Sequence, residues 1–379
     1  MKRRVDEKER LGPIPAKSRM KSHQNKLLKE DEKDTNPSNL GLDSLPLDLK
    51  MAILTRVPAK SLMTFRCVSK MWYSIIRSRG FIDSYFSMSS KKQSRFIVAL
   101  SNGLFNKIGE KLIFFFTFSN EGEESSSLVP TFEMAMPSVS FSYISGSCTS
   151  LHGFLALRVV GEKILCNPNT EQFTTDGDTL KVPMDLPYSP LPPNICISGF
   201  LYYGAYSLSQ TKDPLVVCFD VRSEQLSFIK APNVVLQWKK DAVFIDYKGK
   251  LASIVRDPYC RFTSFDFWLL DDPKKHKWSK KTCVFPFSVW DYVGNVKVCF
   301  PGTNKAGEII IAPQKLSYDV RPFYIFYYNV ETKKMRRVRL LGIGDDEEFR
   351  RSYGFVNHGD CLVRIAPQHI ESIAFLKDL

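Results

Sequence analysis

Apolar positions recur at two different spacings along the chain, and the change between them divides it into regions. In residues 44–76, "SLPLDLKMAILTRVPAKSLMTFRCVSKMWYSII", bulky apolar residues recur every three or four positions, which is the spacing of amphipathic helices. From about residue 92 onward, short apolar runs alternate with turn residues, which is typical of β-strands. Residues 1–41 are polar and charged, so we expect them to be disordered. The pattern predicts an α+β multidomain chain with a tail (1–41), a helical module (42–88) and an all-β domain (92–379).

The helical module contains the signals for three short helices. Asp43 or Ser44 is placed to cap the first helix, and Ser69 is placed to cap the third. Pro58 separates the first two, because a proline restricts the residue before it. The first helix is apolar on two opposite sides, one carrying Leu45, Leu49 and Ile53 and the other Leu47, Met51 and Leu54.

Three helices of this size can bury only one apolar face among themselves. Each large apolar side chain left in water forgoes about 1.5–3 kcal/mol of burial free energy. We therefore expect the second face to be covered, either by a partner protein or by the β domain of the same chain.

The helical module resembles the F-box, the short module that docks onto the SKP-class adaptor of SCF ubiquitin ligases. The matching motifs are Leu45-Pro46, Asp48-Leu49, Ile53-Leu54, Val57-Pro58, Lys60-Ser61-Leu62, Phe65 to Lys70, and Trp72. The resemblance implies that the adaptor covers the second face. Nine residues match family positions that form either the adaptor-binding surface or the small core beneath it: Pro46, Leu49, Ile53, Leu54, Pro58, Leu62, Phe65, Val68 and Trp72.

The β domain contains an internal repeat. Five segments begin with Gly and run into apolar residues, at positions 153, 199, 249, 307 and 359. Four of them are followed by a strand that ends in an Asx turn residue, with pivots at Asn167, Asp220, Asp271 and Asn329, spaced by 53, 51 and 58 residues. A period near 50 predicts a β-propeller of kelch-like repeat length with about six blades, five or seven being allowed. We expect residues 95–120 to supply the first blade and the tail "ESIAFLKDL" to add the strand that closes the ring.

Two of these repeat segments, "VVCFDVRSEQLSFIKAP" and "LLDDPKKHKWSKKTCVFP", are similar to the F-box associated domain of plant F-box proteins. This resemblance implies that the propeller is a protein-interaction domain.

Composition adds a net charge of +13 and nine scattered cysteines. The basic clusters "KKHKWSKK" (274–281) and "KKMRRVR" (333–339) fall at expected hairpin turns, so we interpret them as solvated loops and expect no nucleic-acid partner. The scattered cysteines and the absence of a visible secretory signal favour reduced thiols in the nucleus or cytoplasm. The longest apolar runs are too short to span a membrane.

The sequence offers no catalytic constellation. Its five histidines lack metal-ligand spacing, and it contains neither a nucleophile elbow nor a phosphate-binding loop. His152 and His358 each precede a repeat Gly, so we interpret them as turn residues, and we expect Cys67 to be a small packed thiol. We therefore predict no catalytic residue, no metal site and no cofactor.

Together the two resemblances imply a substrate-recognition subunit of an SCF-type ubiquitin ligase. The helical module would bind an SKP-class adaptor and, through it, a cullin scaffold, while the propeller would bind a substrate protein through residues that the sequence does not identify. One alternative is a basic propeller that binds nucleic acid or acidic proteins, with the helical module serving oligomerisation. Another is an F-box protein that acts outside ubiquitination.

Overall fold

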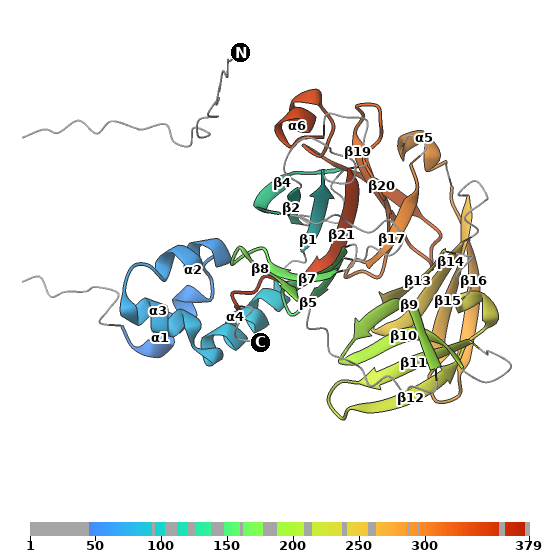
Figure 1. The fold of residues 1–379 in the computed structure, drawn as a ribbon, viewed down its shortest axis with the longest axis horizontal. Helices are drawn as coiled ribbons and strands as arrows, with labels where there is room; N and C mark the ends of the chain where they lie inside the picture. The colour runs from blue at the N-terminus through green and yellow to red at the C-terminus, as the bar shows by residue number, and fades with distance from the viewer. Residues whose placement is uncertain are drawn as a thin grey trace, which may run out of the picture. The chain divides into compact units, whose positions relative to one another are not determined.

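The computed structural model describes thirteen stretches of the chain (Figure 1). They are residues 45–92, 95–102, 112–119, 126–137, 148–159, 162–176, 188–207, 214–236, 241–256, 263–286, 288–293, 296–355 and 361–375. The tail that we predict to be disordered, residues 1–41, lies outside them. Residues Leu47–Leu379 form one compact unit, so the helical module and the sheets are described together.

The helical module consists of four helices, one more than predicted. They are α1 (Leu47–Leu54), α2 (Ala59–Phe65), α3 (Lys70–Arg77) and α4 (Arg79–Lys91). The predicted cap of the third helix is confirmed, because the backbone N–H of Trp72 donates to the Ser69 hydroxyl (3.3 Å). Ser78 caps α4 in the same way by accepting from the N–H of Phe81 (3.3 Å). The signal for this missed helix was a second Ser followed three residues later by a buried aromatic.

Five sheets form the β domain, each one blade of a propeller. Blade 1 is β21 (Leu362–His369), β1 (Arg95–Ser101), β2 (Leu112–Ser119) and β4 (Pro130–Pro137). Blade 2 is β5 (Cys148–Leu151), β6 (Phe154–Val159), β7 (Glu162–Asn167) and β8 (Gln172–Asp176). Blade 3 is β9 (Tyr188–Ile197), β10 (Phe200–Ser207), β11 (Pro214–Asp220) and β12 (Gln225–Lys230). Blade 4 is β13 (Asp241–Tyr247), β14 (Lys250–Arg256), β15 (Ser264–Asp272) and β16 (Lys277–Val284).

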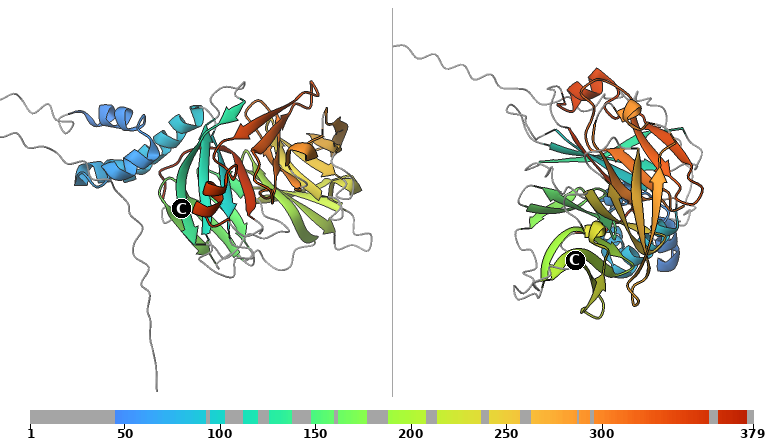
Figure 2. Two further views of the ribbon diagram at one scale, coloured as in Figure 1. Left: turned by 90° about the horizontal axis from the view of Figure 1, so that it is seen from above. Right: turned by 90° about the vertical axis from the view of Figure 1, so that its right-hand side faces the viewer.

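Blade 5 is β17 (Val298–Thr303), β18 (Ile309–Pro313), β19 (Phe323–Tyr328) and β20 (Met335–Leu340), with β3 (Ser127–Leu128) added in parallel to β20. Three short helices lie in connections between strands: η2 (Asn233–Leu236), α5 (Trp290–Val293) and α6 (Glu347–Ser352). Because β3 comes from the connection between two strands of blade 1, it ties the last blade to the first. Figure 2 shows these sheets from two further directions.

The ring has five blades, where division of the length by the period gave about six. The last repeat, which begins at Gly359 in the sequence, does not form a blade of its own. Its strand, β21, instead pairs antiparallel with β1, from Arg95↔His369 to Ser101↔Leu362. The first and last repeats therefore share one blade, which accounts for the difference.

The C-terminal strand closes the ring as the first strand of blade 1. β21 lies next to β5 and β17, the first strands of the two flanking blades, and next to β1 (Figure 1). The prediction that "ESIAFLKDL" adds the closing strand is therefore wrong, because the described part of that tail, residues 371–375, follows β21 and is not a strand. This tail has another role, described below.

Tight two-residue turns join the first and second strands of blades 2, 3 and 4. Both central residues have positive φ, for example His152 (49°) and Gly153 (81°), or Lys248 (54°) and Gly249 (79°). This geometry is the type I′ turn, whose twist matches that of the flanking strands. The interpretation of His152 as a turn residue is confirmed, while His358 lies outside the described residues.

Asx turns join the third and fourth strands, and they correct one predicted pivot. The side-chain oxygens of Asn167, Asp220 and Asn329 accept the backbone N–H two residues downstream, at 2.9–3.0 Å. In blade 4 the residue that does so is Asp272 (N–H of Lys274, 2.9 Å), not Asp271. A break in strand register between Leu270 and Asp272 moves the turn by one residue. In all four blades a positive-φ residue lies four positions after the pivot: Glu171, Glu224, His276 and Lys333.

The two ends of the ring differ because each blade is an up-and-down meander. The first-to-second and third-to-fourth turns all lie at one end, which we call the turn face. The strand ends that lead into the second-to-third connections and into the connections between blades lie at the other end, the loop face. The two basic clusters predicted to be solvated turns lie only partly in turns. Residues Lys274–His276 and Lys333–Lys334 lie in the turns before β16 and β20, and the remaining residues of each cluster lie on these two strands.

Candidate functional site

The core of the helical module accounts for three of the nine residues predicted to form its adaptor surface or core. Leu54, Leu62 and Trp72 are buried together with Ile76 and Phe81. These three side chains are therefore the small core on which the helices pack.

Five of the remaining predicted residues are exposed. Leu49 and Ile53 on α1 are 49% and 47% exposed, and Val68, which follows α2, is 65% exposed. Pro46 and Pro58 are exposed as well, and Phe65 is half-buried against the core. Leu47, which the prediction did not include among the adaptor residues, is 59% exposed. Four large apolar side chains of the helical module are thus exposed, and we refer to them together as the exposed apolar surface: Leu47, Leu49, Ile53 and Val68.

The thiol of Cys67 lies beside this surface rather than inside the module. Cys67 is exposed, so the prediction of a packed thiol is wrong. The reason is local: residues 66–68 form a turn between α2 and Ser69, with the N–H of Cys67 donating to the carbonyl of Thr64 (3.0 Å). A turn at the surface leaves the side chain outside the packed helices.

Another side of the helical module is covered by the chain's own C-terminal tail, residues 370–375. Ile373 is fully buried and belongs to the same core as Leu62 and Trp72. The guanidinium of Arg66 lies 4.1 Å from the ring centroid of Phe375. The sequence left open whether the same chain or a partner covers the helical module. The chain's own tail covers this side of the module, and the exposed apolar surface lies outside that contact.

The tail and α4 also contact the turn face. A Cβ on Gly153 would collide with the Cβ of Ser372 and lie 2.9 Å from the carbonyl oxygen of Ile370, so the tail passes directly over the turn between β5 and β6. The amide of Asn167 donates to the carbonyls of Ser372 (3.1 Å) and Ala374 (2.9 Å). The ring of Phe86 on α4 lies 5.4 Å from that of His152. Lys305, before the turn into β18, donates to the carbonyl of Lys92 (2.7 Å).

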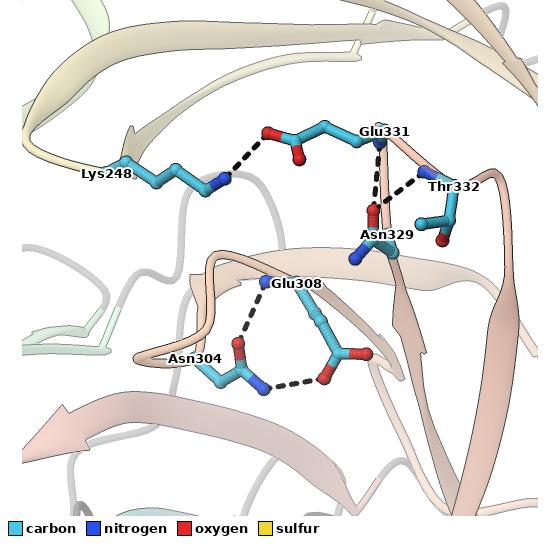
Figure 3. A network of polar contacts seen from close by, with 6 residues as sticks. All are labelled: Lys248, Asn304, Glu308, Asn329, Glu331 and Thr332. Atoms are coloured by element: carbon cyan, nitrogen blue, oxygen red, sulfur yellow. Dashed lines mark hydrogen bonds and ion pairs between the residues drawn. The ribbon is translucent and has the colours of Figure 1, made fainter.

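Polar contacts join blades 4 and 5 on the same face (Figure 3). Lys248 forms an ion pair with Glu331 (2.7 Å), and this contact raises the pKa of Lys248 and lowers that of Glu331. Asn304 donates to Glu308 (2.8 Å) and accepts from its backbone N–H (2.8 Å). The ion pair connects a turn of blade 4 to a turn of blade 5, and the Asn304–Glu308 contacts close the single turn between β17 and β18, so both stabilise the turn face. Within the described residues, no three His, Cys, Asp or Glu side chains lie together as metal ligands.

The loop face of blade 5 carries a small, shallow hollow with an enclosed volume of about 10 Å³. It is lined by residues of α5, the β18–β19 connection, the start of β19 and α6, among them Tyr292, Tyr324 and Arg350. Arg350 donates to the carbonyls of Gly344, Tyr318 and Asp319 at 3.0–3.1 Å, which holds these connections together. Arg337 lies over the rings of Tyr292 (4.2 Å) and Tyr324 (5.3 Å).

Comparison with known proteins matches both parts of the chain. Residues 42–84 match the F-box domain and residues 176–360 match the F-box associated beta propeller domain. A protein of Arabidopsis thaliana that is named as an F-box protein, At1g32660, is 59% identical to this chain; the alignment covers 97% of this chain and 93% of the relative. F-box protein At1g30790 is 45% identical over 88% of this chain and 99% of its own, and F-box protein DOR is 29% identical over 83% and 92%, both from Arabidopsis thaliana.

Solved structures align less closely. β-1,2-Mannobiose phosphorylase from Listeria innocua aligns with 66% of this chain and 78% of its own, at 12% identity and a TM-score of 0.29. The sequence relatives and the two matched domains carry the assignment. The chain belongs to the F-box proteins, with an F-box followed by an F-box associated β-propeller domain.

Proposed function

We propose that this protein is the substrate-recognition subunit of an SCF-type ubiquitin ligase. The observation that carries the proposal is the exposed apolar surface of Leu47, Leu49, Ile53 and Val68. Four large apolar side chains at 47–65% exposure on one small module are costly in water, which favours a role for them in binding a partner. An F-box domain is expected to bind an SKP-type adaptor, which would supply the missing cover and link the chain to a cullin scaffold.

The two faces of the propeller suggest where a substrate protein would bind. The C-terminal tail and α4 contact the turn face at Gly153, Asn167 and Lys305. Among the described residues, no such contact is found on the loop face, which carries the hollow between α5 and α6. Binding sites in propellers and similar scaffolds are commonly built on the longer connections, which supports a substrate site on the loop face.

In this role the chain itself catalyses nothing. It holds a substrate near a ubiquitin-charged conjugating enzyme, which raises the effective concentration of substrate lysines at the reacting thioester. The contacts between the tail, α4 and the turn face support this role, because a fixed connection between the two domains limits the volume that a bound substrate can explore.

A pull-down with purified components tests the adaptor step. The full-length chain should retain an SKP-class adaptor, and the double variant Leu49→Asp/Ile53→Asp should lose it. Both residues are about half exposed in the chain alone, so the substitutions should leave the unfolding temperature nearly unchanged. Each places a carboxylate in an interface that would be apolar, which costs several kcal/mol of binding.

Val284→Asp is the matched control. Val284 is also an exposed apolar residue, but it lies on β16 of the propeller, and its substitution should leave adaptor binding intact. A wild-type chain that ignores the adaptor, or a double variant that still binds it, would contradict the proposal.

A further inference from the structure

The outer strand of blade 3 has an unusual surface. β12 is the last strand of its four-stranded sheet, so one of its edges has no described strand beside it (Figure 1). Gln225, Leu226, Ser227 and Phe228 are all exposed, and Leu226 and Phe228 are each 43% exposed. Because side chains alternate along a strand, these two apolar residues lie on the same side of the sheet.

Other outer strands of the propeller carry features that prevent pairing with another chain. β16 contains Lys277, Lys280 and Lys281, and lysines on an edge repel an incoming strand. β20 is covered by β3, and β4 begins and ends with Pro130 and Pro137. β8 is one residue shorter than β12 and ends in Asp176. Among the described residues, the "QLSFI" run of β12 contains no charge or proline and no strand pairs with its outer edge, so this edge offers a site for strand addition.

The residues of β12 are complementary to themselves in one antiparallel register. With Ser227 on a two-fold axis, Leu226 of one copy lies opposite Phe228 of the other, and both apolar pairs form at once. The same register brings Glu224, a turn residue with φ of 55° directly before β12, toward Lys230 of the other copy, so opposite charges approach each other at each end. Apolar and opposite-charge pairs across strands each contribute about 0.2–1 kcal/mol.

We propose that β12 pairs with β12 of a second copy and forms a symmetric dimer of this protein. The two blades would join into one continuous sheet, an isologous contact of the kind that closed dimers use. The indole N–H of Trp278 donates to the carbonyl of Lys230 (3.0 Å), so backbone pairing ends at this residue while its side chain stays exposed. The paired segment is therefore short and centred on Leu226, Ser227 and Phe228.

A contact of this length buries little surface, so the dimer should be weak. We expect dissociation in the micromolar range, as for small protein interfaces. Sedimentation velocity of the full-length chain, over loading concentrations from about 1 to about 100 μM, should show a monomer converting to a dimer. A chain that remains monomeric over this range overturns the proposal.

Charged substitutions at the centre locate the interface. Leu226→Lys and Phe228→Lys should each shift the chain to monomer by at least tenfold in dissociation constant, with circular dichroism unchanged. Phe173→Lys is the matched control, since Phe173 is equally exposed but lies on the outer strand of blade 2. Dimerisation that survives both β12 substitutions, or that is lost in Phe173→Lys, would place the contact elsewhere.

A charge reversal tests the register itself. Glu224→Lys alone should weaken the dimer because it sets two lysines opposite each other, and Lys230→Glu alone should weaken it in the same way. The double variant Glu224→Lys/Lys230→Glu should restore the wild-type dissociation constant. Lysine is tolerated in the turn geometry of residue 224, since Lys333 has the same positive φ at the equivalent position of blade 5. Failure of the double variant to recover would overturn the two-fold register.

Adaptor binding is measured in the same samples. Since β12 lies on the propeller, the Leu226→Lys variant should still retain the SKP-class adaptor. The dimer and the proposed ligase role are therefore judged by separate readouts.

Discussion

Tyr85 donates its phenolic hydrogen to the carboxylate of Glu371 (3.3 Å), although 286 residues separate the two in sequence. The contact joins α4 of the helical module to the segment that follows the last strand. Burial raises the pKa of the Tyr85 hydroxyl, and the neighbouring Glu371 carboxylate raises it further, so the hydroxyl remains a donor at physiological pH. Arg95, the first residue of β1, forms an ion pair with the same carboxylate.

The tail should therefore be a structural part of the helical module. We predict that Ile373→Ala lowers the stability of the helices by about 2–5 kcal/mol, because it removes a fully buried side chain from their core. Denaturant unfolding monitored at Trp72, which lies in that core, would report the change. Tyr85→Phe is the milder comparison and should cost about 1 kcal/mol, since it removes one hydrogen bond and keeps the ring. Unchanged unfolding of the Ile373→Ala variant would show that the tail packs there without contributing stability.

Substitution of a buried F-box residue should mainly lower stability, and substitution of an exposed one should mainly weaken adaptor binding. Leu62→Ala should destabilise the helical module by about 2–5 kcal/mol, because Leu62 is fully buried. Ile53→Ala should change stability by less than about 0.5 kcal/mol and should instead weaken adaptor binding. Thermal unfolding and adaptor affinity, measured on the same preparations, check this division. Equal effects of both substitutions on both quantities would argue against it.

His369 should make the propeller sensitive to mild acid. Burial lowers the pKa of this imidazole to about 3, with nearby Arg95 acting in the same direction, while the ring contacts the Ser150 hydroxyl (3.0 Å). In the unfolded chain the pKa is about 6.5, so between pH 6.5 and 3 the unfolded state binds a proton that the folded state does not. Stability should therefore fall with decreasing pH across this window, by at most about 1.4 kcal/mol per pH unit from this residue.

The comparison variant is His369→Gln, which cannot take up that proton. Relative to the wild type, its stability should decline less steeply between pH 6.5 and 4, as measured by urea unfolding at a series of pH values. If the stabilities of the two proteins fall in parallel with decreasing pH, protonation of His369 does not contribute to the loss of stability between pH 6.5 and 4.

The blade 4 turn provides a matched pair of neighbouring residues. Asp272→Ala should cost about 1 kcal/mol, because it removes the acceptor for the backbone N–H groups of Lys274 and Lys275. Asp272→Asn should be nearly neutral, since Asn fills the same position in blades 2 and 5. Asp271→Ala removes only a hydrogen bond from Ser279 (3.2 Å) and should cost less than Asp272→Ala. If chemical denaturation shows a larger loss of stability for Asp271→Ala than for Asp272→Ala, Asp271 and not Asp272 is the residue that stabilises the turn.

Local patterns predicted the parts of the fold that depend on neighbouring residues. The Ser69 cap, the two-residue turn at His152 and Gly153, and the repeated Asx turns are all set within a few positions of sequence. The break in strand register that moved the pivot from Asp271 to Asp272 depends on how β15 and β16 pair, which spacing along the chain does not reveal.

Features that depend on distant residues were missed. The number of blades depends on β21 pairing with β1, and the covering of the helical module depends on Ile373, which is far from the helices in sequence. The division of the nine F-box residues was also inaccessible, because an apolar residue has the same periodicity whether it faces the core or a partner. The structure separates Leu54, Leu62 and Trp72 from Leu49, Ile53 and Val68 by their exposure.

Closure of the ring by β21 and completion of the helical core by Ile373 both depend on a segment that follows the F-box and the other four blades in sequence. Neither the F-box nor the propeller can therefore reach its final packing until this segment has been synthesised. A prematurely terminated chain would leave β1 without its neighbour and the helices without their cover, exposing apolar surface to chaperones and proteases. Only chains that contain this segment would then pack both domains.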